Sequence, residues 1–151
     1  MEADLQVFLD TSVLFAAVHS ETGGSRLILK LGEASAISIW VGPTVLRESE
    51  SVLSRKSPQS KVYFALWLDR AGVQVGEEAG NEAIDKALTI VRYVPDAQVL
   101  AEALTISVDY FVSLDRKHLV GNPLADQKLT FPIGTPGDFI DWYRKWLKGK
   151  F

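Results

Sequence analysis

Four acidic residues stand at positions from which their carboxylates could meet. Asp10 follows a short apolar run at residues 5–9, and Asp115 ends a second apolar run further along the chain. Glu48 lies on an amphipathic helix pattern, and Asp96 stands in the first turn of another. Carboxylate oxygens are the ligands that Mg²⁺ and Mn²⁺ prefer, and such an ion can polarise a phosphoryl oxygen and lower the pKa of a bound water. These residue types therefore predict metal-assisted chemistry on a phosphoryl group.

The elements that must position these acids alternate along the chain. Apolar runs are followed by helix patterns, which predicts a mainly parallel, Rossmann-like sheet within a three-layer α/β/α domain of 151 residues. Right-handed crossovers bring the carboxyl ends of parallel strands to one edge of a sheet, so the four acids can converge there. The expected strands span residues 5–9, 36–41, 73–75, 110–115 and 129–131, and the expected helices 12–20, 25–32, 44–56, 57–72, 77–92, 95–104 and 135–147.

Converging carboxylates repel one another, and some of them stay protonated unless a positive charge joins them. A hard divalent cation resolves this conflict, and we predict Mg²⁺ or Mn²⁺ bound by Asp10, Asp96 and Asp115. Nearby hydroxyl groups are expected to orient the carboxylates or the metal-bound waters. These hydroxyls belong to Thr11, Ser12 and Ser113.

Each acid also has an ordinary structural interpretation. Asp10 and Asp96 stand at helix starts, where aspartate caps the helix and interacts favourably with its dipole. Glu48 fits the solvated face of an amphipathic helix. One acid alone would favour these interpretations, and the recurrence of acids at equivalent positions favours a shared site.

The segments around these acids resemble the motifs of the PIN-domain family, and most closely its small ribonuclease toxins from bacterial and archaeal toxin–antitoxin pairs. The resemblance implies a metal-dependent endoribonuclease acting on single-stranded RNA, with Asp10, Glu48, Asp96 and Asp115 as its catalytic acids and an antitoxin protein as a partner. The matching segments are residues 8–14 (FLDTSVL), 44–48 (TVLRE), 95–103 (PDAQVLAEA), 111–119 (FVSLDRKHL) and the closing strand and helix at 131–139 (FPIGTPGDF).

The chain departs from the family pattern at a few positions. Ser49 follows Glu48 where the family usually has an apolar residue, and Glu50 is a second candidate for the helix acid. Ser12 and Ser113 stand where Asn and Thr are common. These changes are mild, and we interpret the site as intact.

The net charge of −3 gives no overall attraction to RNA, so contacts with the backbone must come from local basic residues or bound cations. Arg47, Arg116 and Lys117 are the candidates near the carboxyl edge of the sheet. The alternative for each is an ordinary solvated charge. His19 and His118 are too few and too dispersed for a histidine metal site, so we expect surface roles for both.

The remaining composition suggests where and how the protein acts. The acidic first residues lack the positive stretch of a secretory signal, and the chain has no cysteine, so a cytoplasmic protein is expected. Residues 62–68 are all apolar, and a helix covered on more than one side indicates a homodimer interface.

Two other functions are compatible with the same residues. A strand-ending Asp10 could accept a phosphoryl group, although no second acid follows two residues later. The domain could also be a non-catalytic interaction module in which the acids only cap helices. Metal response and trapping of phosphate distinguish these from a nuclease.

Overall fold

Buried apolar runs form the strands of the sheet. The last three residues of β1 (Gln6–Leu9) are buried, and so are all three residues of β4 (Tyr110–Val112). Strands covered on both faces in this way are typical of parallel sheets with helices on each side. The computed structural model, which describes residues 5–56 and 58–150, has this α/β arrangement, and the predicted fold class is confirmed.

The strand order creates a reversal beside β1. Neighbours are parallel throughout the order β3-β2-β1-β4-β5, which includes β2 (Ser38–Val41), β3 (Gln74–Val75) and β5 (Ile133–Gly134). The chain builds outward from β1 to β3 and then returns to the other side of β1 at β4. The carboxyl ends of β1 and β4 therefore flank a topological switch point, where open α/β sheets bind their ligands.

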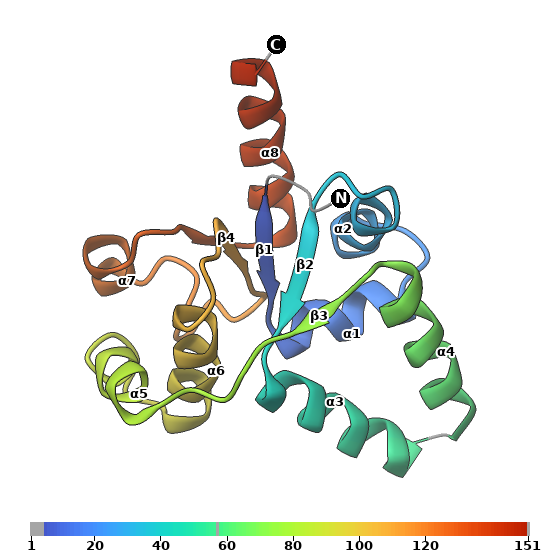
Figure 1. The fold of residues 1–151 in the computed structure, drawn as a ribbon, viewed down its shortest axis with the longest axis horizontal. Coiled ribbons are helices and arrows are strands. Elements are labelled where there is room, and N and C mark those ends of the chain that lie inside the picture. Colours follow the sequence, from blue (N-terminus) through green and yellow to red (C-terminus); the bar gives the residue numbers. More distant parts are fainter. Residues whose placement is uncertain (1–4, 57, 151) are drawn as a thin grey trace.

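The helices lie on both sides of the sheet. Figure 1 shows α1 to α4 on one side, near β2 and β3, and α5 to α7 on the other. Right-handed crossovers on either side of the switch point require this separation. The last helix, α8, packs against β4, β5 and α2. The helices are α1 (Thr11–His19), α2 (Gly24–Glu33), α3 (Pro43–Lys56), α4 (Pro58–Arg70), α5 (Asn81–Leu88), α6 (Val94–Leu104), α7 (Pro123–Lys128) and α8 (Pro136–Lys150).

Aromatic packing fixes β1 against β4. Phe8 and Phe111 are partners in the parallel register, and their rings stack with centroids 5.1 Å apart. Phe131 stacks on the same Phe111 ring at 6.5 Å. Such pairs contribute about 0.5–1.5 kcal/mol each beyond the burial of their area. Because this packing sets the register of the two strands, it also sets where the residues that follow them meet.

The last predicted strand is wrong. Residues 129–131 form no strand, and the pairing with β4 comes later, from the Phe111 N–H to Pro132 O at 3.0 Å and the Ser113 N–H to Gly134 O at 2.9 Å. Phe131 is buried by ring stacking rather than by a ladder, so its apolar character was misleading.

Two helix predictions also needed correction. The helix expected at 77–92 is only α5, because Gly80 is its N-cap and Thr89 its C-cap. Glycine is better tolerated at a cap than inside a helix. The sequence interpretation missed α7, which begins at Pro123 after the N-cap Asn122. None of the helices in the described residues is long and apolar enough to cross a membrane.

Candidate metal and active site

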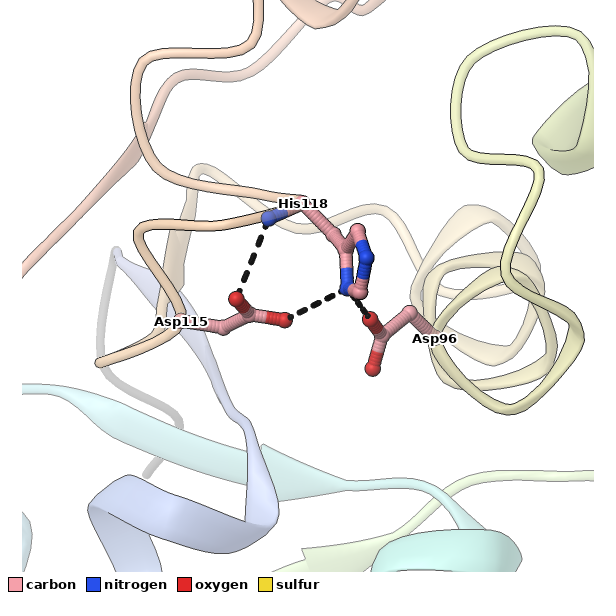
Figure 2. A group of neighbouring side chains, drawn as sticks. All are labelled: Asp96, Asp115 and His118. Carbon is pink, nitrogen blue, oxygen red and sulfur yellow. Dashed lines mark hydrogen bonds and ion pairs between the residues drawn. The ribbon is translucent and has the colours of Figure 1, made fainter.

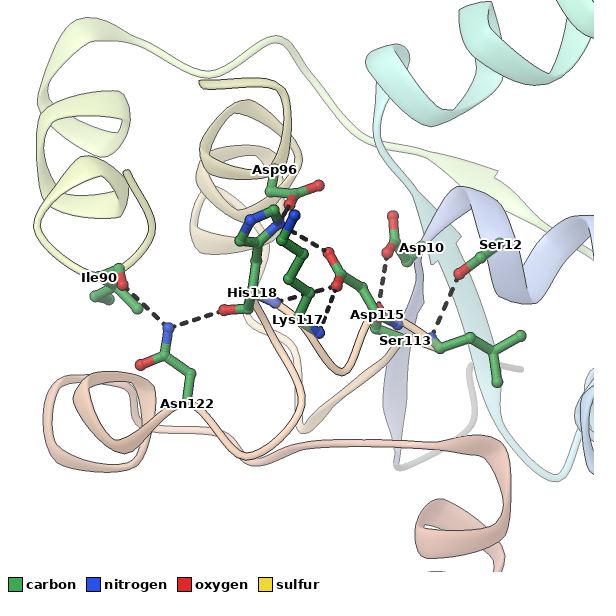
Figure 3. Close-up of polar contacts among 10 residues, drawn as sticks. Asp10, Ser12, Ile90, Asp96, Ser113, Asp115, Lys117, His118 and Asn122 are labelled. Atoms are coloured by element: carbon green, nitrogen blue, oxygen red, sulfur yellow. Dashed lines mark hydrogen bonds and ion pairs between the residues drawn. The ribbon is translucent and has the colours of Figure 1, made fainter. Parts of the chain in front are cut away.

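Asp10 lies between β1 and α1 in the chain, and its side chain contacts the loop that follows β4. Its Oδ1 accepts the Thr11 backbone N–H at 2.8 Å, which makes it the N-cap of α1. Its Oδ2 accepts the Ser113 hydroxyl at 2.8 Å, and the residue is 9% exposed (Figure 3). Asp10 therefore does cap a helix. Its second carboxylate oxygen is hydrogen-bonded to Ser113, which lies on the β4 side of the switch point.

The loop after β4 is folded by side-chain hydrogen bonds. β4 ends at Val112, so Asp115 lies in this loop and not at the strand end itself. The Ser113 oxygen that donates to Asp10 also accepts the Asp115 N–H at 3.0 Å. Asp115 Oδ1 in turn accepts the backbone N–H groups of Lys117 at 2.9 Å and His118 at 3.1 Å. This Asx-type turn bends the chain back and brings His118 over Asp115.

Asp96 reaches the same loop from the first turn of α6. Its Oδ2 lies 2.7 Å from His118 Nδ1, and that nitrogen lies 3.5 Å from Asp115 Oδ2 (Figure 2). One ligand atom from each of these three residues lies within 4.8 Å of the other two. The group is therefore compact enough to share one cation, with Asp10 joined to it through Ser113.

Burial and mutual repulsion raise the pKa of two acids in this group. Burial raises the pKa of Asp10, and the charges of Asp115 and Glu48 add to the effect against the opposing hydrogen bonds from Ser113 and Thr11. Burial also raises the pKa of Asp96 to about 6, together with its hydrogen bond to Asp115 and the charges of Asp115 and Asp10. Without a cation, the ionised forms of these acids are disfavoured.

Asp115 differs from its neighbours. Burial acts to raise its pKa, but the backbone N–H of His118, the hydrogen bond with Asp96 and the backbone N–H of Lys117 together lower it below the usual value. Asp115 is therefore the acid of the pair that ionises first as pH rises, and Asp96 keeps its proton up to about pH 6 in the metal-free protein.

Glu48 lies beside Asp10 at the exposed rim of the site. Its Oε2 accepts the Thr11 hydroxyl at 2.8 Å, and its charge contributes to the raised pKa of Asp10. The structure thus brings Glu48, rather than Glu50, to the start of α1. Ser12 contributes differently, since its hydroxyl accepts the Leu114 N–H at 3.4 Å and ties α1 to the β4 loop.

His118 does not have the surface role that we expected. Its side chain is 29% exposed, and its Nδ1 faces two carboxylates. His19 does lie on the surface, where its Nδ1 contacts Phe15 O at the end of α1. His118 reaches this position because the turn formed by Asp115 brings it against Asp96 on α6. The spacing of three residues between Asp115 and His118 is the sequence signal that indicates this proximity.

The predicted basic residues lie in two different settings. Arg47 forms an exposed salt bridge with Glu78 at 2.8 Å, so part of its charge is already neutralised. Arg116 and Lys117 line a cavity of about 470 Å³ together with Arg92 and His118. This cavity adjoins the acidic group, because His118 belongs to both.

The donor set fits a divalent cation. Asp96 and Asp115 each present a carboxylate oxygen close to His118 Nδ1, and Asp10 is linked to Asp115 by two hydrogen bonds through the Ser113 hydroxyl. The raised pKa values of Asp10 and Asp96 arise partly from the other acids, which is the repulsion that a cation would remove.

The fold matches solved structures, among them the following two. A chain of VapBC2 from Rickettsia felis, solved bound to a promoter DNA fragment, superposes with a TM-score of 0.63 and 12% identity, covering 85% of this chain and 97% of that one. VapC20 of Mycobacterium tuberculosis, a sarcin–ricin loop cleaving toxin, gives 0.52 and 18%, covering 74% and 92%. No protein-family model and no curated protein matches this chain. At these identities the likeness shows the fold alone, and it confirms the PIN-type architecture that the motifs predicted.

Proposed function

We propose that this chain, which has the fold of VapC toxins, is a divalent-metal-dependent endoribonuclease that hydrolyses single-stranded RNA as the toxin of a toxin–antitoxin pair. The observation that carries the proposal is the close group formed by Asp96, Asp115 and His118, with Asp10 joined through Ser113. Hydrolysis of a phosphodiester is the chemistry that a cation in such a group supports. VapC20, which cleaves the sarcin–ricin loop, supports the same class of reaction.

In this proposal Asp10, Asp96 and Asp115 hold Mg²⁺ or Mn²⁺, which when bound polarises a phosphoryl oxygen and lowers the pKa of water. Ser113 orients two of these acids at once, because its hydroxyl donates to Asp10 Oδ2 and accepts the Asp115 N–H. The Thr11 hydroxyl orients Glu48, and we assign Glu48 Oε1 as the atom that accepts a proton during hydrolysis.

RNA contacts are assigned to the basic side of the site. Arg116 and Lys117 line the cavity next to His118, so they are suited to backbone phosphates, and Arg47 can join them when its pair with Glu78 opens. A charge reversal at Arg116 should weaken RNA binding and reduce the dependence of log affinity on log salt by about 0.7 per lost phosphate contact. An unchanged salt slope would remove Arg116 from the proposed contact surface.

Partners, domain organisation and location are also proposals. The resemblance implies an antitoxin partner. The length of the chain supports a single nuclease domain over residues 1–151, and the acidic first residues and the absence of cysteine support a cytoplasmic protein. Exposed apolar side chains on α4, Val62, Tyr63 and Leu66, support a homodimer through this helix. Phe64 and Trp67 of the same apolar run are buried instead, so the interface could use only one face of α4. Monomeric sedimentation at tens of micromolar would contradict the dimer.

The deciding experiment compares the wild type with Asp10→Asn on defined single-stranded RNAs, with Mn²⁺ and with chelator. We expect Asp10→Asn to lower cleavage by about 10³-fold while the protein stays folded by circular dichroism. Asp85→Asn, on the exposed face of α5, is the matched control and should cleave at the wild-type rate. Cleavage by a clean Asp10→Asn preparation, or cleavage that persists in chelator, would contradict the proposal.

The non-catalytic module remains the second candidate, since Asp10 does cap α1. A protein whose melting temperature does not rise with Mn²⁺ and which cuts no RNA would support that function. Phosphoryl transfer to Asp10 is disfavoured, because the residue is 9% exposed and both of its oxygens already accept hydrogen bonds.

A further inference from the structure

His118 occupies the place of a ligand in the acidic group. Its Nδ1 lies 2.7 Å from Asp96 Oδ2 and 3.5 Å from Asp115 Oδ2. Two ligands at right angles around an ion with bonds of 2.0–2.1 Å lie about 2.9 Å apart. The two distances lie on either side of this value. The imidazole nitrogen is therefore spaced from the carboxylate oxygens as one ligand is from its neighbours.

The ring is held in this place from several directions. Tyr93, just before α6, stacks on it with centroids 5.0 Å apart and planes inclined by 25°. The backbone N–H of His118 donates to Asp115 Oδ1, and its carbonyl accepts the Asn122 side-chain N–H at 2.9 Å. Figure 3 shows Asn122 on the side of His118 away from Asp96 and Asp115. Contacts on the backbone and on the ring face thus fix the orientation of Nδ1 before any ion binds.

We propose that His118 Nδ1 is a direct ligand of the ion and gives the site a preference for Mn²⁺ and Co²⁺ over Mg²⁺. This inference rests on the proposed metal site and adds to it the class of ion. Mg²⁺ favours oxygen donors and keeps several waters, whereas imidazole nitrogen suits the transition metals. A site of carboxylates alone lacks this bias. His118 thus changes which divalent cation the protein selects.

The competing role for His118 is a hydrogen bond that only positions Asp96. In that case Nδ1 carries a proton toward Asp96 Oδ2, and loss of the imidazole weakens all divalent ions alike. Ligation instead predicts a loss that depends on the ion. It also predicts a nitrogen nucleus bonded to the metal, which a positioning role does not produce.

The experiment uses the full chain without a histidine tag, loaded with Mn²⁺ in the absence of RNA. Pulsed electron paramagnetic resonance should detect a ¹⁴N coupling that changes to ¹⁵N on labelling with ¹⁵N-histidine. The sequence has two histidines, and His19 stands at the far end of α1 from Asp10. The signal should therefore persist in His19→Gln and disappear in His118→Gln.

Calorimetric titration of the same proteins supplies the second measurement. In His118→Gln and His118→Ala the ratio of Mn²⁺ to Mg²⁺ affinity should fall by about tenfold. The ratio of Co²⁺ to Mg²⁺ affinity should also fall. His19→Gln should leave both affinities unchanged. The spectrum of the Mn²⁺-loaded wild type needs no variant, so a poorly folded variant does not prevent a decision.

The outcomes separate this inference from the proposed function. Mn²⁺ binding that is lost in Asp115→Asn but shows no histidine nitrogen coupling overturns the role of His118 and leaves the metal-dependent nuclease standing. Equal losses of Mn²⁺ and Mg²⁺ affinity in His118→Gln have the same meaning. A wild type that binds neither ion overturns both.

Discussion

Two acids on α6 show two different uses of a carboxylate in this fold. Glu102 is 2% exposed, and its oxygens accept the backbone N–H of Thr44 at 2.8 Å and the hydroxyl of the same residue. Asp96, in the first turn of the same helix, faces Asp115 and His118 and has its pKa raised to about 6, chiefly by burial and by Asp115. The more deeply buried acid is the one whose hydrogen bonds are satisfied by neutral donors.

Glu102 completes the start of α3. The residue before this helix is Gly42, which has no side chain to cap it, and the Glu102 carboxylate supplies the acceptor and the negative charge that a helix N-terminus favours. A Cβ atom at Gly42 would clash with Glu102 Oε1, so the glycine makes room for this contact. Glu102, whose two oxygens accept hydrogen bonds from neutral donors, stabilises the fold. Asp96 faces another acid instead, and in the proposed function a cation offsets their repulsion.

The largest effect that we predict breaks the Glu102 contact. Glu102→Ala leaves the Thr44 N–H and hydroxyl buried without an acceptor and should lower the free energy of unfolding by about 3 kcal/mol. Glu102→Gln, which keeps the shape and one acceptor oxygen, should cost about 1 kcal/mol. Urea denaturation followed by circular dichroism measures both.

The matched control for this prediction is Glu82→Ala on the exposed face of α5, which should change stability by no more than about 0.5 kcal/mol. Mn²⁺ should still raise the melting temperature of folded Glu102→Gln. If Glu102→Ala were as stable as the control, the distinction between a structural and a functional acid on α6 would be lost.

The next effect has the opposite sign. Asp96→Asn removes a carboxylate whose ionised form is disfavoured in the folded state, so at pH 7.5 in chelator it should raise the free energy of unfolding by about 2 kcal/mol. The same change should abolish the rise in melting temperature caused by Mn²⁺. A variant that is less stable than the wild type yet still responds to Mn²⁺ would make Asp96 an ordinary helix-start acid.

The pH dependence sharpens the same point. The pKa of Asp96 is raised from 3.8 when unfolded to about 6 when folded, so its protonated form stabilises the metal-free protein fully below pH 3.8, and this contribution is lost as pH rises through 6. Asp96→Asn resembles the protonated form. The stability difference between the two proteins should therefore be near zero at pH 4 and open between pH 4 and pH 6. A constant difference across this range would contradict the assignment.

The sequence predicted one of these two acids and missed the role of the other. Asp96 was identified because it opens a helix in a chain with acids after two apolar runs. Glu102 looked like any helix glutamate, since its partner Thr44 is 58 positions away and only the packing of α3 against α6 brings them together. His118 was missed for a similar reason, because its place depends on the turn formed by Asp115.

Local sequence signals predict some elements of the fold better than others. The strands β1 and β4 were predicted from continuous apolar runs, which is the pattern that burial on both faces produces. The start of α7 has a local signal in Asn122 followed by Pro123, an N-cap and a first-turn proline, which apolar periodicity does not detect because the helix is short. The apolar residues 129–131 predict a strand that does not form, because burial alone does not distinguish ring packing from ladder pairing.

The smallest effect concerns a buried polar group with nothing to satisfy it. Ser49, on α3 next to Glu48, is 0% exposed, and its hydroxyl has no hydrogen-bond partner within the part of the chain that the structure describes. Ser49→Ala should raise the free energy of unfolding by about 1 kcal/mol, because it removes this hydroxyl and improves helix propensity. Ser51→Ala, exposed on the same helix, gains only the propensity of about 0.5 kcal/mol. The difference between the two variants in urea denaturation isolates the cost of the unsatisfied hydroxyl.

RNA cleavage should change less than twofold in both variants, since the contact of Glu48 with Thr11 does not involve Ser49. A Ser49→Ala protein that loses activity would show that this buried hydroxyl supports the position of Glu48.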